Sequence, residues 1–166
     1  MTAINTNFNT ELAERFHRLP TDEQLALFWF IYTEMGGSIT PAAPDAGTAS
    51  TGIAEGLYNQ VKEMSREEQL QVQRDLVARK NSLISREYGA LSDTTKLLFW
   101  YLLARGMDDE EIIPFPDDYQ LSGESDHLFQ QIKNLEFSEQ ITLFRDIVAP
   151  MGVDPDAVPH DRNTGL

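Results

Sequence analysis

The most restrictive feature of this sequence is an internal duplication. When the chain is shifted by 71 residues, positions 21–78 align without a gap onto positions 92–149. The two segments share 14 identical residues in 58 positions, where ordinary residue usage predicts about four by chance. We call residues 21–78 the first copy and residues 92–149 the second copy. The duplication predicts two copies of one structural unit, related by a pseudo-twofold axis.

Helix signals recur through both copies, and strand signals are nearly absent. Thr21 with Gln24 and Ser65 with Glu68 have the spacing of a capping box, which predicts a helix start at each place. No stretch alternates cleanly between apolar and polar residues. The predicted helices span residues 10–18, 22–35, 50–64, 66–86, 93–107, 122–135 and 138–149. The fold class is therefore predicted to be all-α.

The chain length of 166 residues is that of one domain. We place this domain at residues 10–153, with an N-terminal tail at 1–9 and a C-terminal tail at 154–166. A loop at 38–51 is rich in Pro, Ala, Gly and Thr. A second loop, 112–116, is apolar and stiffened by two prolines. Since loops normally face water, this second loop either packs on the core or contacts an apolar ligand.

The charge balance excludes several classes of function. The net charge is −14 and the chain has no cysteine. An acidic protein is a poor partner for nucleic acid or for an anionic membrane surface. Without cysteine, the protein can form neither disulfides nor cysteine-ligated metal sites. With no secretory signal and no apolar run near the ~20 residues that span a bilayer, we expect a cytoplasmic protein without a transmembrane segment.

Residues for catalysis are scarce. His17, His127 and His160 lie far apart and lack the spacing of metal ligands, and no glycine-rich phosphate loop occurs. We predict neither an enzyme nor a metal site.

The aromatic residues are more informative, because Trp29 and Trp100 occupy equivalent positions in the two copies. One interpretation is a core stripe, which is the ordinary role of a single aromatic residue. The other is an elongated apolar ligand held along the seam between the copies, since clustered Tyr and Trp need a polar partner when buried. Arg74 and Arg145 are also equivalent, either as surface charges or, for Arg145, at the rim of a tunnel.

Four ordered segments resemble a known family. Residues 25–36, 96–101, 114–122 and 140–145 are similar to the N-terminal domain of the orange carotenoid protein of cyanobacteria. The similarity extends over residues 10–153. Since the second, C-terminal domain of that protein would begin where this chain stops, the resemblance implies a helical carotenoid protein, the free-standing paralogue of the domain.

The resemblance implies two interleaved four-helix units that enclose a carotenoid tunnel. The ligand would be a ketocarotenoid, canthaxanthin or echinenone-like, bound without a covalent link. The residues that match the family's contacts, or that would join the tunnel wall, are Leu25, Phe28, Trp29, Tyr32, Trp100, Tyr101, Met107, Phe115, Tyr119, Ile141 and Arg145. Gln73 and Arg74 stand where the family has methionine and cysteine, so the tunnel lining differs there.

The function implied is photoprotection, in which the pigment quenches singlet oxygen and excited antenna pigment. One alternative is a carotenoid carrier that exchanges pigment with a homologue of the C-terminal domain. Another is a quencher that docks on the phycobilisome, at the thylakoid surface. The charge of −14 weighs against docking, because phycobilisome proteins are also acidic and like charges suppress encounter.

Overall fold

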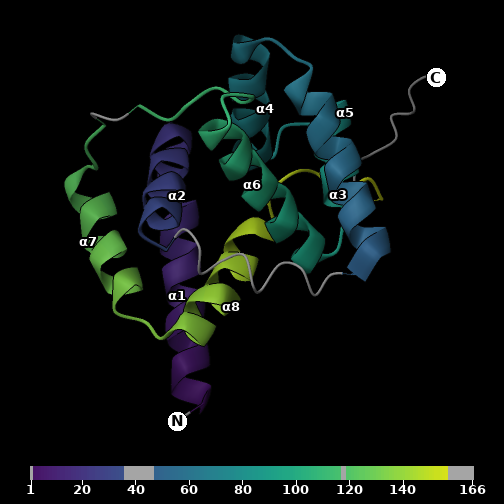
Figure 1. The fold of residues 1–166 in the computed structure, drawn as a ribbon. Coiled ribbons are helices and arrows are strands. Elements are labelled where there is room, and N and C mark those ends of the chain that lie inside the picture. The colour runs from purple at the N-terminus through teal and green to yellow at the C-terminus, as the bar shows by residue number, and fades with distance from the viewer. Residues whose placement is uncertain (1, 36–46, 117–118, 157–166) are drawn as a thin grey trace.

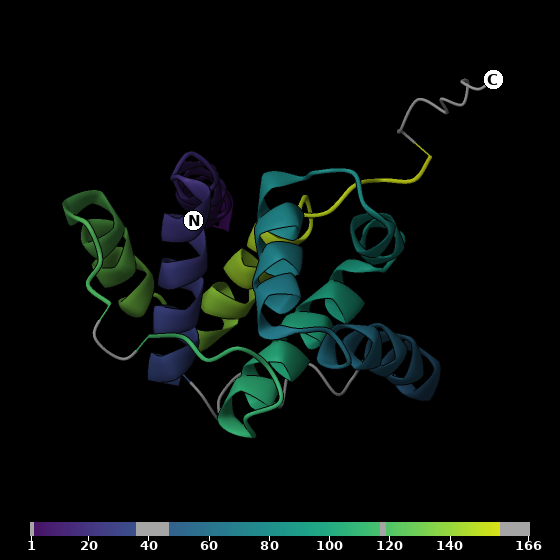
Figure 2. The same cartoon turned by 90° about the horizontal axis from the view of Figure 1, so that it is seen from above.

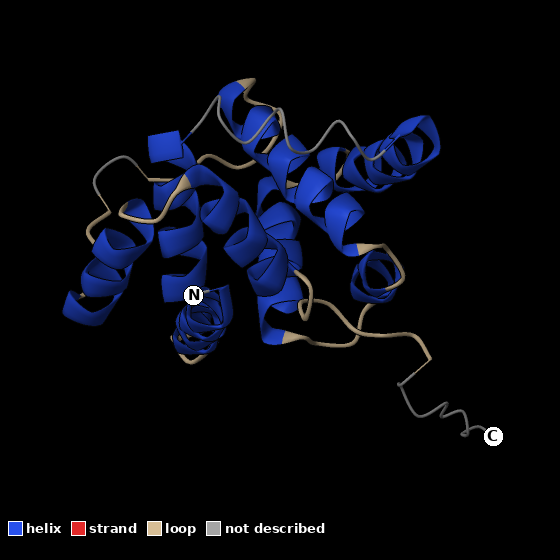
Figure 3. Cartoon of the chain, turned by 90° about the horizontal axis from the view of Figure 1, so that it is seen from below, coloured by secondary structure: helices blue, strands red, loops and turns tan. Residues whose placement is uncertain are grey.

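A computed structural model describes residues 2–35, 47–116 and 119–156 of the chain. These residues form eight helices and contain no strand (Figure 3), which confirms the all-α prediction. The helices are α1 Thr2–His17, α2 Thr21–Met35, α3 Gly47–Lys62, α4 Arg66–Ala78, α5 Leu83–Gly89, α6 Asp93–Asp108, α7 Gly123–Lys133 and α8 Phe137–Val148. None of the described helices is both long enough and apolar enough to cross a membrane.

The helix starts depend on local caps, and one of the two predicted capping boxes forms. The Ser65 hydroxyl accepts from the backbone N–H of Glu68 at 3.1 Å, and the Glu68 carboxylate accepts from the N–H of Ser65 at 3.0 Å. The box predicted at Thr21 is wrong. Thr21 lies inside α2, and the Gln24 side chain donates instead to the carbonyls of His17 and Leu19, at 3.1 and 2.8 Å. Gln24 therefore closes the turn between α1 and α2.

The single helix predicted over 66–86 is also wrong, because the structure has two helices there. Arg79 follows α4 in the left-handed conformation, with φ 60° and ψ 40°. The N–H of Lys80 then donates to the carbonyl of Asp75 at 2.9 Å, which ends the helix. Ser82 begins α5 by accepting from the N–H of Ser85 at 3.0 Å. No glycine marks this helix end, so the usual sequence signal was missing.

Three further boundaries differ from the prediction or lie outside the described residues. Helix α1 begins at Thr2, eight residues before the predicted start. Helix α8 begins at Phe137, and the N–H of Glu136 donates to the Glu139 carboxylate at 3.1 Å, so Ser138 is not its cap. The glycine pair at 36–37 and most of the 38–51 loop lie outside the residues that the structure describes.

Equivalent helices of the two copies pack against equivalent neighbours. Equivalent helices are α2 and α6, α3 and α7, and α4 and α8. Helix α2 packs on α4 as α6 packs on α8, and α3 packs on α6 as α7 packs on α2. Helix α1 packs on α8 as α5 packs on α4. The equivalent helices α3 and α7 consequently lie at opposite sides of the molecule (Figures 1 and 2).

Buried glutamines show the same equivalence at the level of single bonds. Gln69 in α4 donates through Nε2 to the carbonyl of Val61 at 3.3 Å. Its counterpart Gln140 in α8 donates to the carbonyl of Ile132 at 2.9 Å. Residues 61 and 132 are themselves equivalent positions, so each copy uses one glutamine to join its last helix to the helix before it.

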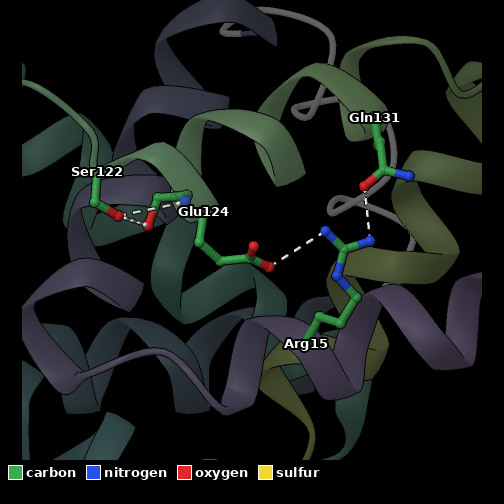
Figure 4. A network of polar contacts seen from close by, with 5 residues as sticks. Arg15, Ser122, Glu124 and Gln131 are labelled. Carbon is green, nitrogen blue, oxygen red and sulfur yellow. Dashed lines mark hydrogen bonds and ion pairs between the residues drawn. The ribbon is translucent and has the colours of Figure 1, made fainter.

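Helix α7 is tied to α1 by a polar contact across the chain (Figure 4). The Arg15 guanidinium donates to Oε1 of Gln131 at 2.7 Å and lies 3.3 Å from the Glu124 carboxylate. Arg15 is partly buried and Glu124 is exposed, with 19% and 58% of their side chains accessible. A short charge-assisted bond to a partly buried arginine is stronger than an ion pair with an exposed carboxylate, so we assign the positioning of α7 mainly to Gln131.

Candidate ligand pocket

An apolar pocket opens between α2, α4, the end of α6 and the loop that follows α6. Its volume is about 200 Å³. Pockets that enclose a whole small ligand usually measure roughly 300–1,000 Å³, so this pocket is smaller than those. It is lined by Asp22, Leu25, Ala26, Trp29, Leu70, Gln73, Arg74, Met107, Ile113, Pro114, Phe115, Pro116 and Tyr119.

Two charged residues stand on the exposed side of this lining. Arg74 donates through Nε and Nη2 to the two carboxylate oxygens of Asp22, at 2.9 and 3.2 Å. Their side chains are 41% and 61% accessible. Because the pair is bidentate and wet, it holds α4 beside α2 at the pocket without burying a charge.

A third polar residue of the lining, Gln73, is buried. Only 1% of it is accessible. Its Oε1 accepts from the indole N–H of Trp29 at 3.2 Å, and its Nε2 has no hydrogen-bond acceptor. A buried amide N–H without an acceptor is rare in proteins, so Gln73 is an unusual residue of the pocket lining.

The aromatic rings form a continuous series from the pocket to the centre of the fold. The Trp29 ring lines the pocket and lies 5.7 Å from the Trp100 ring. Tyr32 lies 6.3 Å from Trp29 and 6.5 Å from Tyr101. Phe28 contacts both indoles, at 5.1 and 5.4 Å. Both tryptophans are almost fully buried, so the centre of the seam is filled by their own rings.

The loop after α6 packs on the core, which is one of the two roles that its apolar sequence suggested. Ile112 is fully buried, and the N–H of Ile113 donates to Oε1 of Gln69 at 2.7 Å. The Phe115 ring lies 5.6 Å from Phe30 and 5.6 Å from Tyr119. The loop therefore packs on the core and presents an apolar face to the pocket.

Glu23 anchors the far end of this loop. Its carboxylate accepts from the Tyr119 hydroxyl at 2.7 Å and from the hydroxyls of Ser122 and Ser125, at 2.9 and 2.5 Å. The bonds from Ser125 and then Tyr119 lower the pKa of Glu23. The same bond to Glu23 raises the pKa of Tyr119 to about 12. Tyr119 is thereby held in the pocket wall in its neutral form.

Nine of the eleven predicted site residues meet in this region. Five line the pocket and four join it through ring contacts, namely Leu25, Trp29, Met107, Phe115 and Tyr119, then Phe28, Tyr32, Trp100 and Tyr101. Ile141 and Arg145 lie outside the pocket lining. Ile141 is buried in α8, and Nε of Arg145 is buried without a hydrogen-bond partner.

The duplication relates the two predicted residues outside the lining to two residues within it. Ile141 and Arg145 are the counterparts of Leu70 and Arg74, which do line the pocket. Of this pair only Leu70 had not been named from the sequence, and shifting Ile141 by 71 positions finds it. Ile113 lies in the apolar loop 112–116 that the sequence analysis marked, whereas Asp22 had no such signal. Within the described part of the chain, no three His, Asp or Glu side chains are grouped as metal ligands.

Comparisons with known proteins identify the fold. Residues 2–154 match the family described as orange carotenoid protein, N-terminal. An orange carotenoid-binding domain-containing protein of Nostoc sp. strain PCC 7120 is 51% identical over 140 residues, which are 84% of this chain and 81% of that protein. The orange carotenoid-binding protein of Synechocystis sp. strain PCC 6803 is 39% identical over 138 residues, which are 83% of this chain and 43% of that protein.

Solved structures of carotenoid proteins have the same fold as this chain. The red carotenoid protein of Anabaena (Nostoc) sp. PCC 7120 binding canthaxanthin has a TM-score of 0.79 and 57% identity, covering 89% of this chain and 99% of that one. The orange carotenoid protein of the same organism binding canthaxanthin has a TM-score of 0.82 and 39% identity, covering 90% of this chain and 47% of that one.

The chain belongs to the family of the orange carotenoid protein's N-terminal domain, which confirms the resemblance. This is a family of carotenoid-binding proteins and not of enzymes, in agreement with the sequence analysis. The chain spans less than half the length of the orange carotenoid-binding proteins that it matches.

Proposed function

We propose that this chain binds a ketocarotenoid such as canthaxanthin without a covalent bond, and that the pigment protects the cell by quenching singlet oxygen. The observation that carries the proposal is the continuity between the apolar pocket and the contact of Trp29 with Trp100. One end ring of the pigment fits the pocket. The conjugated chain continues past Trp29 and between the two indoles, whose rings part to admit it.

The duplication supports a second end for the same ligand. A carotenoid is a rod of roughly 30 Å, the length of a 20-residue helix. It is therefore longer than the pocket. Ile141 and Arg145 are the counterparts in the second copy of Leu70 and Arg74, which line the pocket, so we infer that they mark the other end of the ligand. In this proposal a tunnel with pseudo-twofold symmetry runs between two interleaved four-helix units, with the pocket at one end.

The energy of binding comes from burial. Apolar surface removed from water contributes on the order of 25 cal/mol per Å², offset by the ordering of ligand and side chains. Tryptophan and tyrosine faces stack on the conjugated chain. Quenching is a property of the polyene, so the protein's part is to hold the pigment in a defined conformation. A ligand that binds only the folded protein also raises its stability.

The test is pigment uptake by the apoprotein. We expect the purified chain to take up canthaxanthin, to become coloured, and to shorten the lifetime of singlet-oxygen luminescence more than the apoprotein does. Trp29→Ala should lose colour at temperatures where the helix content survives. Phe137→Ala, which changes an exposed ring on α8, is the matched control and should keep the colour. A folded, colourless wild-type protein that fails to take up canthaxanthin would contradict the proposal.

The open side of the pocket favours a second role, that of pigment carrier. Pro114 and Pro116 in its wall are exposed, as is Asp22. A ligand whose end reaches this opening could pass to an acceptor, such as a homologue of the C-terminal domain. Mixing the holoprotein with such an acceptor should move the absorption band within minutes if transfer occurs. An unchanged spectrum in the mixture would leave the chain as a fixed quencher.

A further inference from the structure

We propose that the Gln73 side-chain amide donates a hydrogen bond to a ring carbonyl of the bound pigment and selects ketocarotenoids over hydrocarbon carotenoids. The inference rests on the proposed carotenoid binding, and it names the group that recognises the end ring. It follows from the position of Gln73 and from the hydrogen bonds of its two amide atoms.

The Trp29 indole determines which way the amide faces. An indole N–H is only a donor, so the atom that it meets must be the amide oxygen. Trp29 Nε1 lies 3.2 Å from Oε1 of Gln73. The two N–H bonds of Nε2 are therefore directed elsewhere, and Nε2 has no acceptor among the described residues. The amide is a positioned donor in the wall of an apolar pocket.

Packing alone does not require a glutamine at this position. The equivalent residue of the second copy is Phe144, which is almost fully buried in the same helix register. An apolar side chain is thus compatible with this place in the fold. A buried amide without an acceptor is costly, whereas phenylalanine at the same position carries no such cost.

The other buried glutamines of the described chain behave differently. Gln24, Gln69 and Gln140 all use Nε2 to donate to backbone carbonyls. Each of them joins two segments of backbone. Gln73 is the exception in this group, and it is also the one of the four that lines the pocket. Its Nε2 makes no bond to the scaffold and is buried beside the pocket, so in this proposal it meets the ligand once the pocket wall opens to admit the end ring.

The chemistry of the missing acceptor identifies the ligand class. A hydrocarbon polyene offers no acceptor, whereas a ketone conjugated to the polyene offers an sp² oxygen with two lone pairs. Arg74 is the competing donor in the pocket, but it is turned to Asp22 with two bonds and is 41% accessible. A hydrogen bond from a buried neutral amide discriminates more strongly than one from a wet guanidinium, because water cannot replace it.

The test compares three pigments on the apoprotein: canthaxanthin with two ring ketones, echinenone with one, and β-carotene with none. We expect wild type to prefer canthaxanthin over β-carotene by tenfold or more in Kd. Gln73→Met should reduce this preference at least fivefold by weakening canthaxanthin alone. Gln71→Met is the matched control on the same helix, since Gln71 is exposed and donates to Asp75 at 2.8 Å. It should behave as wild type.

An unchanged preference in Gln73→Met would overturn this inference and leave pigment binding intact. Loss of the preference in Arg74→Met alone would assign the ketone to Arg74 and also overturn it. If Gln73→Met does not fold, Gln73→Leu provides the same comparison. The infrared carbonyl band of canthaxanthin bound to wild type should also lie below its position in hydrocarbon solvent; an unshifted band contradicts the proposal. Failure of wild type to bind any of the three pigments would overturn the proposed function itself.

Discussion

The indole rings of Trp29 and Trp100, which occupy equivalent positions in the two copies, lie 5.7 Å apart and have different hydrogen-bond partners. Trp29 donates to Gln73 in the pocket wall at 3.2 Å. Trp100 donates to the Tyr88 hydroxyl at 2.9 Å, inside the core. The surroundings of the two equivalent tryptophans therefore differ between the copies. Trp29 lines the pocket, whereas Trp100 is covered by Tyr88 of α5.

Removing the Tyr88 hydroxyl should destabilise the fold. Tyr88 is fully buried, accepts from Trp100 and donates to the carbonyl of Val148 at 2.7 Å. Tyr88→Phe leaves the Trp100 indole N–H buried and unpaired, which costs about 1–3 kcal/mol, while the Val148 carbonyl keeps its bond from the N–H of Met151 at 3.2 Å. Urea denaturation should show this loss in the free energy of unfolding.

Tyr58→Phe is the comparison for that variant. It is the same chemical change, but the partner of Tyr58 is the exposed carboxylate of Glu111, at 2.7 Å. Water can solvate Glu111 after the change, so the loss should be smaller than that of Tyr88→Phe, which leaves a buried donor without a partner. Equal losses in the two variants would contradict the assignment of Tyr88 as a buried link between α5, α6 and α8.

His17 should make stability depend on pH. Burial lowers the pKa of His17, against the bond between Nε2 and the carbonyl of Ile147 at 2.9 Å. The unfolded state, with a pKa near 6.5, therefore binds a proton at a higher pH than the folded state does. The free energy of unfolding should fall as the pH is lowered from 7 through 6.5 towards the folded pKa.

The variant His17→Gln isolates this contribution. A glutamine amide can donate to the same carbonyl and carries no titratable proton. Thermal unfolding of both proteins between pH 7 and pH 5.5 should show a smaller decline for the variant. A decline of the same size in both proteins would show that other groups cause it.

Glu23→Gln should lower the pKa of Tyr119. The hydrogen bond to the Glu23 carboxylate is the largest cause that raises the pKa of Tyr119 to about 12. Without the negative charge, that pKa should fall towards the ordinary value near 10. A spectrophotometric titration of phenolate should find one of the five tyrosines ionising at lower pH than in wild type. Ser122→Ala keeps the bond from Tyr119 to Glu23 and should leave the Tyr119 titration in place.

Arg79→Gly should stabilise the protein. A residue other than glycine in the left-handed conformation costs roughly 1–2 kcal/mol, while the added freedom of glycine in the unfolded chain costs about 0.5–1. Arg79 has φ 60° and is exposed, so the net gain should be about 0.5–1 kcal/mol. Chemical denaturation measures it directly. Arg79→Ala keeps the strain and should give no gain; a gain equal to that of glycine would refute the backbone explanation.

Helix content was predictable because it depends on local spacing of residues, and the duplication was predictable because it is visible when the sequence is aligned with itself. The box of Ser65 with Glu68 formed as its spacing predicted. The end of α4 was not predictable in the same way, because Arg79 adopts a conformation for which its residue type has little preference. The capping box predicted at Thr21 does not form, because the Gln24 side chain donates to two carbonyls in the turn before α2.

The sequence by itself determined the helical class, the repeat, the family and most of the residues around the tryptophan pair, because spacing and residue type carry that information without any knowledge of long-range contacts. Only the tertiary structure decided where the pocket opens and that Gln73 keeps a free donor within it. The physical reason is that satisfaction of a buried amide depends on which atoms a neighbouring helix presents to it. Here the packing of α2 on α4 brings the Trp29 indole to the oxygen of Gln73 and no acceptor to its nitrogen.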